Sequence, residues 1–330
     1  MIMIKKSAKL SKKLFAHDID QTPTRNGYGD ALLDLGENNP DVVVLSADLA
    51  ESTRALAFGK KYPDRFFEVG VAEQNMMGVA AGLALSGKIP FISSYATFSP
   101  GRNWDQLRVS VCYSRANVKV VGSHAGLSVG PDGATHQALE DIAMTRVLPN
   151  LTVVVPCDYE EAKKCTRAAA GLSGPVYFRL AREKTPVFTT VDTPFKIGRA
   201  EILRDGDDLT IIGCGPVLYE ALVAADELSK HGIEATVLNN HTIKPIDSET
   251  IIKAASRTRA VVTVEEHQVN GGLGGAVAEV LAKAYPAPME MIAMPDTFGE
   301  SGQPRELQEK YHLVASDIVR AAKNVLKRKN

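Results

Sequence analysis

A carboxylate, Glu73, follows the apolar segment Phe66–Val71 and opens a run of small and apolar residues. This order predicts a strand that passes into a helix, and such junctions lie at the sheet edge where α/β proteins bind ligands. The helix expected after Glu73 is apolar on nearly all sides, so we expect it to be buried. Burial raises the pKa of a carboxyl group and lets it hold a proton near neutral pH. Glu73 is therefore a candidate for proton transfer, unless it only stabilises a helix N-terminus.

A second candidate group lies in and just after a glycine-rich loop, residues 126–133. The loop follows the apolar segment Val118–Val121 and contains Asp132, and His136 comes shortly after it. Glycine lets the backbone approach a ligand closely. A histidine exchanges protons near neutral pH, and a carboxylate accepts hydrogen bonds from hydroxyl groups. We therefore expect these two side chains to act on a hydroxylated substrate, with an N-cap role as the alternative for Asp132.

The segments that must position these residues alternate between short apolar runs and stretches of helical composition from residue 21 to 183. This alternation predicts an α/β domain with a mostly parallel, doubly wound sheet and helices on both faces. The apolar runs are rich in β-branched residues, as strands covered on both faces are. We expect strands at Val42–Leu45, Phe66–Val69, Ile89–Ile92, Val118–Val121, Thr152–Val155 and Val176–Phe178, and helices at 26–38, 73–86, 102–114, 137–147 and 158–171.

The alternation resumes in a second, smaller α/β domain, residues 197–330, after a linker at 184–196 that lacks periodicity. Gly206-Asp207-Asp208 is typical of a hairpin turn that leads into the next strand. Residues 1–20 are rich in lysine, and we expect a solvated basic arm or one that lies on a partner. The strands expected in this domain are Leu209–Ile212, Ala235–Leu238, Val261–Val264 and Met289–Ile292, with helices near 216–231, 248–256, 273–284 and 315–327.

The composition is that of an ordinary two-domain globular chain, with 330 residues, 45% hydrophobic and 23% charged. A formal net charge of −1 gives no electrostatic reason to expect nucleic acid or a membrane as a partner. No apolar run approaches membrane-spanning length, and the N-terminus lacks the apolar core of a signal peptide. The four cysteines show no CxxC spacing, which indicates reduced thiols and a cytoplasmic protein. They are Cys112, Cys157, Cys165 and Cys214.

Five motifs together resemble those of transketolase-type thiamine diphosphate enzymes. They are SADLAES (46–52), VAEQN (71–75), YATF (95–98), DGATHQ (132–137) and FGESG (298–302). The motifs follow the family's order across nearly the whole chain. By this resemblance, residues 21–183 form the pyrimidine-binding domain and residues 197–330 form the C-terminal domain. Some prokaryotes encode this half of transketolase as the separate subunit of a split enzyme.

The resemblance implies a set of cofactor-binding residues. Glu73 would hydrogen-bond the aminopyrimidine ring of thiamine diphosphate and so help to remove the proton from thiazolium C2. Phe98 would stack on that ring, with Tyr95 and Arg102 nearby, and Asp48 would lie beside the thiazolium. The alternative for Tyr95 and Phe98 is a core position at the end of a strand.

The resemblance also implies the substrate-binding groups. His136 would transfer a proton to a sugar hydroxyl or carbonyl oxygen, and Asp132 would accept a hydrogen bond from a hydroxyl group. Cations and hydroxyl groups suit the substrate's phosphate. The resemblance places these groups at Arg25, Ser52, His124 and Arg179.

The motif that holds the diphosphate and Mg²⁺ in this family, Gly-Asp-Gly followed by Asn, is missing. The nearest match, Gly206-Asp207-Asp208 with Asn239, has the wrong third residue and precedes a strand, so we predict no metal site here. The resemblance implies that an N-terminal-type partner subunit supplies the Mg²⁺ ligands, in a heterotetramer of two subunits of each kind (α₂β₂). Glu265-Glu266-His267 resembles an interface segment of the family, and we expect it in a structural role or a subunit contact.

The function implied is transfer of a two-carbon ketol unit between sugar phosphates, as in the pentose phosphate pathway. The β subunit of a 2-oxo acid dehydrogenase E1 has the same plan but tends to lack the segment at 132–136. A deoxyxylulose-phosphate-synthase-like subunit shares this segment, although that enzyme normally carries the diphosphate domain on the same chain. A non-catalytic assembly subunit is disfavoured, because a scaffold has no need of Glu73, Phe98, Asp132 and His136 together.

Overall fold

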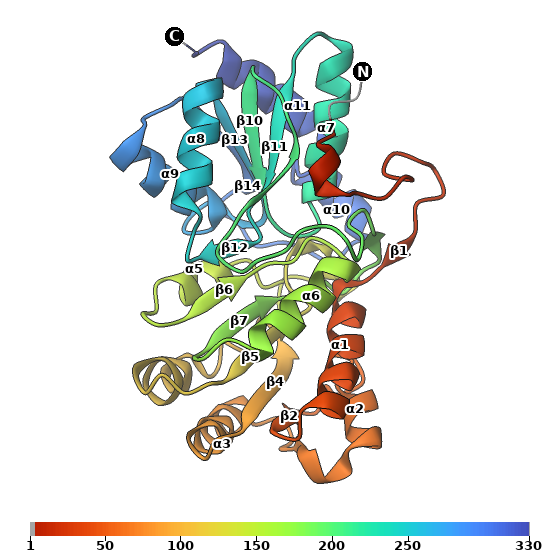
Figure 1. Ribbon diagram of the computed structural model, residues 1–330, viewed down its shortest axis with the longest axis vertical. Helices are drawn as coiled ribbons and strands as arrows, with labels where there is room; N and C mark the ends of the chain where they lie inside the picture. The colour runs from red at the N-terminus through yellow and green to blue at the C-terminus, as the bar shows by residue number, and fades with distance from the viewer. Residues whose placement is uncertain (1–3, 330) are drawn as a thin grey trace.

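A seven-stranded sheet lies at the centre of the first domain in the computed structural model, which describes residues 4–329 (Figure 1). The strand order is β12-β6-β7-β5-β4-β2-β3, and every pairing is parallel except that of β12 with β6. The mostly parallel sheet predicted from the sequence is therefore confirmed. Its strands are β2 (Val42–Ser46), β3 (Phe66–Glu68), β4 (Ile89–Tyr95), β5 (Lys119–Ser123), β6 (Thr152–Val154), β7 (Val176–Arg179) and β12 (Thr242–Lys244).

Helices cover both faces of this sheet. One apolar cluster joins α1 and α6 to one face, and another joins α3 and the π-helix η3 to the other. Burial on both faces explains why the strands are almost continuously apolar. The helical segments are α1 (Thr24–Asn38), α2 (Leu56–Lys61), η2 (Pro63–Arg65), α3 (Glu73–Leu85), α4 (Trp104–Gln106), η3 (Leu107–Tyr113), η4 (Leu127–Asp132), α5 (Asp141–Arg146) and α6 (Tyr159–Ala170).

The second domain contains a smaller sheet of five strands in the order β14-β13-β10-β11-β9, in which only β9 is antiparallel to its neighbour. Helices α7 and α11 lie on one face and α8 and α9 on the other (Figure 1). The strands are β9 (Glu201–Arg204), β10 (Leu209–Gly213), β11 (Ala235–Asn239), β13 (Val261–Gln268) and β14 (Met289–Met294). The helices are α7 (Leu218–Lys230), α8 (Ser248–Thr258), α9 (Leu273–Ala284), α10 (Pro304–Lys310) and α11 (Ala315–Leu326).

The predicted hairpin turn at 206–208 is wrong. Strand β9, which precedes it, pairs with β11, so that β11 lies between β9 and β10. Gly206 is needed for a different reason, since a Cβ atom there would lie 2.5 Å from the carbonyl carbon of Glu234. The glycine marks a close approach of two backbones rather than a hairpin.

The two domains are joined by a strand that crosses from one to the other. Strand β12 comes from the second half of the sequence but forms the edge of the first domain's sheet. Within the expected linker, β8 (Thr185–Pro186) pairs with β1 (Gln21–Thr22) in an antiparallel ladder. The linker is therefore built into the structure, and the second domain packs directly on the first (Figure 1).

A solvated N-terminal arm was predicted from the sequence, but the structure does not show one. From residue 4 onward, the segment, which includes the short helix η1 (Lys6–Ala8), packs on the second domain. Ala8, Leu14 and Ile19 are buried there, and Ile4 forms a bridge to Arg204. The apolar residues spaced among the lysines account for this docking. Residues 1–3 of the expected arm lie outside the described residues.

All four cysteines are buried and unpaired, as the sequence analysis expected of reduced thiols. Among residues 4–329, no helix combines the length and apolar character that a bilayer crossing demands.

Candidate active site

Four neighbouring strands of the first sheet, in the order β5-β4-β2-β3, bring predicted residues to one edge. Parallel strands present their carboxyl ends at the same edge, which is where α/β sheets bind ligands. Asp48 follows β2, Tyr95 ends β4 and His124 follows β5. Glu73 follows β3 as the first residue of α3. Residues far apart in the sequence therefore meet at one edge because the strands between them are adjacent.

Glu73 is a buried carboxylate with a single charged partner. It is 3% exposed, and its Oε1 accepts a hydrogen bond from Arg102 Nη1 at 2.9 Å. Asn103 fixes the start of the helix by donating from Nδ2 to the Glu73 carbonyl oxygen at 3.1 Å. The second carboxylate oxygen has no partner among residues 4–329. Glu73 therefore has an acceptor oxygen available for a further hydrogen-bond donor.

Four rings form what we call the aromatic cluster: Tyr95, Phe98, His124 and His136. Tyr95 stacks on His124 with ring centroids 3.9 Å apart and on Phe98 with centroids 5.8 Å apart. His136 meets Phe98 edge-on at 5.5 Å, and its Nδ1 lies 2.9 Å from the Thr135 hydroxyl oxygen. This leaves His136 Nε2 available for proton transfer.

Arg102 links Glu73 to the aromatic cluster. Its guanidinium carbon lies 4.0 Å from the centroid of the Phe98 ring, in a cation–π contact. A flat heteroaromatic ring can stack on this face of Phe98 only if the guanidinium moves aside. The Arg102 side chain is 48% exposed, so it can move into the solvent. The carboxylate of Glu73 with one free oxygen, next to a phenyl face, fits an aminopyrimidine ring that offers a hydrogen-bond donor.

His124 is a neutral histidine with a defined tautomer. Burial, followed by the charges of Arg25, Arg182 and Arg54, lowers the pKa of His124 to about 3. Its Nε2 lies 3.1 Å from Arg25 Nη1, which can only donate, and its Nδ1 lies 3.0 Å from Ser123 Oγ. Nε2 must therefore be the acceptor and Nδ1 must carry the proton. In this structure His124 serves to hold Arg25.

Three arginines gather around His124, and we call Arg25, Arg54 and Arg182 the arginine cluster. Burial, followed by repulsion from Arg54 and Arg182, lowers the pKa of Arg25. Arg25 Nη1 also donates to the Ser52 carbonyl oxygen at 2.8 Å, and its buried Nε has no partner among the described residues. An unsatisfied donor among repelling cations is an environment that an anion stabilises.

The sequence analysis missed Arg54 and Arg182. Arg182 donates from Nη1 to the Val129 carbonyl oxygen at 2.7 Å and so contacts the glycine-rich loop. Arg54 adopts a left-handed backbone with φ of 70° and donates from Nε to Asn26 Oδ1 at 2.9 Å. The signal that could have found Arg182 is its position just beyond β7, where the chain leaves the ligand-binding edge of the sheet.

Arg179 does not lie in the arginine cluster, contrary to the predicted phosphate-binding role. Its Nε lies 3.0 Å from both carboxylate oxygens of Asp141, and its Nη2 donates to the carbonyl oxygens of Ala138 and Glu266. Burial acts to lower the pKa of Arg179, but the charges of Asp141 and Glu266 offset this and raise it. With a side chain 5% exposed and its donors engaged at the domain interface, Arg179 has a structural role.

Three further predicted residues, Asp48, Ser52 and Asp132, make few side-chain contacts. Asp48 is exposed, with φ of 59°, and its backbone N–H donates to Glu68 Oε1 at 2.7 Å. Ser52 contributes its carbonyl oxygen rather than its hydroxyl group. Asp132 is exposed on the glycine-rich loop and has no side-chain partner among residues 4–329. Their predicted roles stay predictions.

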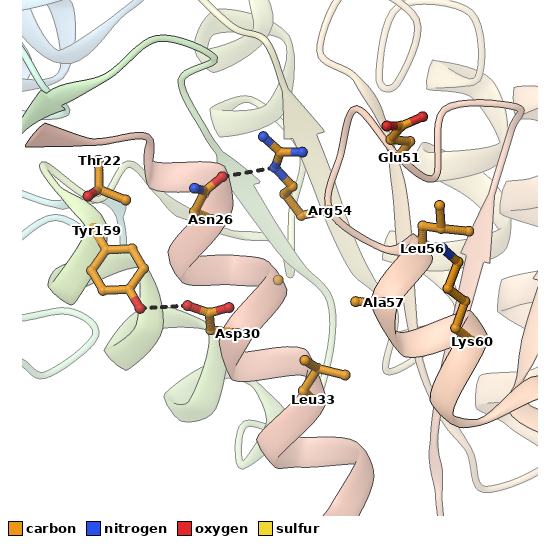
Figure 2. Close-up of a pocket in the computed structure, with 11 residues that line it drawn as sticks. Thr22, Asn26, Asp30, Leu33, Glu51, Arg54, Leu56, Ala57, Lys60 and Tyr159 are labelled. Atoms are coloured by element: carbon orange, nitrogen blue, oxygen red, sulfur yellow. Dashed lines mark hydrogen bonds between the residues drawn. The ribbon is translucent and has the colours of Figure 1, made fainter.

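A cavity of about 610 Å³ opens beside the arginine cluster, between α1, α2 and α6 (Figure 2). Its lining includes Arg54, which donates to Asn26, and Tyr159, which donates to Asp30 at 2.6 Å. Arg54 lines this cavity, but Glu73 and the aromatic cluster do not. This cavity is therefore not where the predicted cofactor residues meet.

The sequence predicted that helix α3 is buried on all sides, but one of its faces is exposed. Met76 and Met77 are fully buried, but Val79 is 39% exposed and Leu85 is 68% exposed. Nothing lies within 4 Å of the position that a Cβ atom of Gly78 would take. One face of the helix is therefore an apolar surface that this chain leaves open.

In the described part of the chain, no group of three or more His, Cys, Asp or Glu side chains could hold a metal ion.

Comparison with known proteins identifies both domains. Residues 20–187 match the family described as the transketolase pyrimidine binding domain, and residues 198–318 match the transketolase C-terminal domain. A putative transketolase C-terminal section of Methanocaldococcus jannaschii is 46% identical over 307 residues, which cover 92% of this chain and 96% of that protein. A 6-deoxy-6-sulfo-D-fructose transketolase subunit of Clostridium sp. (strain MSTE9) is 43% identical over 93% of this chain and 95% of that protein.

A solved structure agrees with this relationship. The split-gene transketolase captured as an inactive tetramer of four β subunits is 48% identical, with a TM-score of 0.88, over 93% of this chain and 99% of that one. Both domains, in the same order, are thus shared along nearly the full length of these relatives. The chain belongs to the transketolase family and corresponds to the C-terminal section of a split transketolase.

Proposed function

We propose that this chain is the C-terminal subunit of a thiamine-diphosphate-dependent transketolase that moves a two-carbon ketol unit between sugar phosphates. The observation that carries the proposal is Glu73, a buried carboxylate with one free oxygen beside Phe98. Thiamine diphosphate, when bound, supplies the nucleophilic carbon at thiazolium C2. The protein's part is to orient the cofactor and to move protons.

Each residue of the site has a defined task in this proposal. The free oxygen of Glu73 would accept a hydrogen bond from, or share a proton with, the ring nitrogen of the aminopyrimidine. Phe98 and Tyr95 position the ring by stacking once Arg102 has moved aside. Asp48 lies on the loop after β2, where it would flank the thiazolium. His136 Nε2 holds or delivers a proton at a substrate oxygen, and Asp132 accepts a hydrogen bond from a substrate hydroxyl group.

The arginine cluster is the proposed site for the anionic end of the substrate. Arg25 and Arg182 replace Arg179 in this role, with His124 and the Ser52 carbonyl oxygen holding Arg25 in place. Two relatives support an anionic sugar, because one is named for 6-deoxy-6-sulfo-D-fructose and another, of Phocaeicola vulgatus, for apulose 4-phosphate. A sulfonate and a phosphate both carry several oxygens that accept hydrogen bonds from guanidinium groups.

A partner subunit is part of the proposal. The Gly-Asp-Gly motif followed by Asn is missing from the sequence, and no group of three or more His, Cys, Asp or Glu side chains lies together among residues 4–329, so we assign the diphosphate and its metal ion to an N-terminal-type chain. The open apolar face of α3, with Val79 and Leu85, begins directly after Glu73 and fits a subunit interface. The proposed assembly is an α₂β₂ heterotetramer in the cytoplasm.

The reaction class and the arginine cluster are tested together by replacing Arg182 with alanine in the assembled enzyme. With a ketose phosphate donor we expect kcat/KM to fall by a factor that corresponds to about 1–3 kcal/mol of lost transition-state binding, as for loss of a charged hydrogen bond. Most of this fall should come from a higher KM. With the unphosphorylated ketose, the loss should be small. The matched control is Arg199→Ala, since Arg199 is exposed and paired only with Asp247 and Glu249 in the second domain.

Equal losses with both donors would remove Arg182 from the phosphate site. Activity of the wild-type enzyme on 2-oxo acids alone would replace the transketolase proposal by the 2-oxo acid dehydrogenase alternative.

A further inference from the structure

The glycine-rich loop that carries Asp132 and leads to His136 is supported mainly from outside itself. Most of this loop is the short 3₁₀ segment η4 (Leu127–Asp132), which is interrupted at Gly130 and contains Pro131. Gly126, Gly130 and Gly133 all adopt positive φ, and the Gly133 N–H donates to the Gly130 carbonyl oxygen at 3.1 Å. Such a loop has little intrinsic preference for one conformation, so its shape must come from its contacts.

Glu266, on β13 of the second domain, supplies the first of these contacts. Its carboxylate accepts the backbone N–H of Ser128, and a Cβ atom at Gly126 would lie 2.5 Å from its Oε1. Glu266 is 4% exposed. Burial raises the pKa of Glu266, whereas the Ser128 N–H and the Arg179 charge act to lower it. A buried carboxylate thus reaches across the domain interface to bind the loop backbone.

Gln137 supplies the second contact. Its side-chain nitrogen lies 3.2 Å from the Leu127 carbonyl oxygen, 3.3 Å from that of Gly130 and 2.9 Å from that of Glu300. The first two acceptors belong to the loop, and the third belongs to the FGESG motif of the second domain. Since Gln137 is 4% exposed, water cannot readily replace these bonds. One amide group therefore ties the loop to the second domain.

Glu266 is itself held by the first domain. Arg179 Nη2 donates to the Glu266 carbonyl oxygen at 2.7 Å, and the same guanidinium is bound by Asp141 of the first domain. Arg182, also of the first domain, contacts the loop directly by donating to the Val129 carbonyl oxygen. The segment Glu265-Glu266-His267, which we expected in a structural role or a subunit contact, is thus buried within the chain. It acts at the interface between the two domains.

We propose that Glu266 and Gln137 are positioning residues through which the second domain sets the place of Asp132 and His136 relative to Glu73 and Phe98. The expected effect on catalysis rests on the proposed function, whereas the positioning of the loop by Glu266 and Gln137 does not depend on it. Neither residue touches the groups that meet the cofactor. Loss of either should therefore impair the step that needs His136 while leaving cofactor activation by Glu73 intact.

Amide hydrogen exchange of residues 126–138 in the isolated chain tests the structural part. In Glu266→Ala, exchange at Ser128 should be at least about tenfold faster, because a protected amide loses its buried acceptor. The control Glu309→Ala removes an exposed carboxylate of the same domain whose one ion pair among residues 4–329 is with Arg305, and its exchange should match the wild type. Unchanged protection in Glu266→Ala would overturn the inference, whatever the enzyme's activity.

The catalytic part is tested in the enzyme assembled with an N-terminal-type subunit, thiamine diphosphate and Mg²⁺, with D-xylulose 5-phosphate as donor. Displacing a catalytic group by about 1 Å costs up to about 100-fold, so kcat in Glu266→Ala should fall about 10- to 100-fold. Proton exchange at cofactor C2 should stay within about twofold of the wild type. Gln137→Glu, which keeps the shape but loses the donors, should behave in the same way.

Two results would overturn the catalytic part. One is an unchanged kcat in both variants, and the other is a C2 exchange rate that falls as far as kcat, which would indicate general damage to the site. A wild-type enzyme that exchanges C2 protons but transfers no ketol unit would contradict the proposed function instead. Amide exchange would then still decide whether Glu266 holds the loop.

Discussion

Replacing Glu73 with glutamine should lower the rate of proton exchange at C2 of bound thiamine diphosphate by about 10²- to 10⁴-fold, the range typical of a lost acid–base group. The amide has nearly the same shape and still forms hydrogen bonds, but it cannot take up and return a proton. It also gives up the ion pair with Arg102, which is half exposed and contributes little to stability. The measurement is hydrogen–deuterium exchange at C2, followed by NMR in the assembled complex.

The matched control for this variant is Glu37→Gln. Glu37 is exposed, lies near the C-terminal end of α1 and pairs only with Lys61 among residues 4–329. Its exchange rate should equal that of the wild type. If Glu73→Gln also exchanged at the wild-type rate while binding the cofactor normally, Glu73 would have no part in cofactor activation.

Replacing Arg179 with alanine should lower the free energy of unfolding by about 3–5 kcal/mol, as expected when one partner of a buried ion pair is removed. Asp141 would be left buried without its cation, and the Ala138 and Glu266 carbonyl oxygens would each lose a donor. Urea unfolding of the isolated chain measures the change. The control is Arg305→Ala, because Arg305 is exposed and its pairs should contribute about 1 kcal/mol or less.

The Arg179 experiment also decides between two roles for one residue. A variant with wild-type stability and a raised KM for phosphorylated substrates alone would restore the phosphate-binding role that the sequence suggested. The structure predicts the reverse, with a large loss of stability.

Local sequence patterns were sufficient for the parts of the fold whose cause is local. Apolar β-branched runs such as 42–45 and 118–121 form strands wherever they occur, and the strand–helix junction at Glu73 follows from the residues on either side of it. The convergence of Glu73, Tyr95, Phe98 and His124 could be predicted from the motifs, because parallel strands open at a common edge.

The features that the sequence did not reveal depend on contacts between distant segments. Arg179 and Arg182 are three residues apart at the end of one strand, and nothing local says which of them turns toward Asp141 and which toward the glycine-rich loop. Strand β12 joins the first sheet only because the second domain docks beside β6. The apolar sequence of α3 could not distinguish a buried helix from one whose outer face remains open for another chain.

The most direct test of the central claim is to measure thiamine diphosphate binding and ketol transfer by this chain alone and after mixing with an N-terminal-type subunit. Calorimetry with thiamine diphosphate and Mg²⁺ gives the affinity, and formation of the aldose product from D-xylulose 5-phosphate gives the activity. We expect weak binding and no turnover by the isolated chain, and both restored at an equimolar ratio of the two subunits. Full transketolase turnover by the purified chain alone, or none after assembly with its partner, would contradict this account.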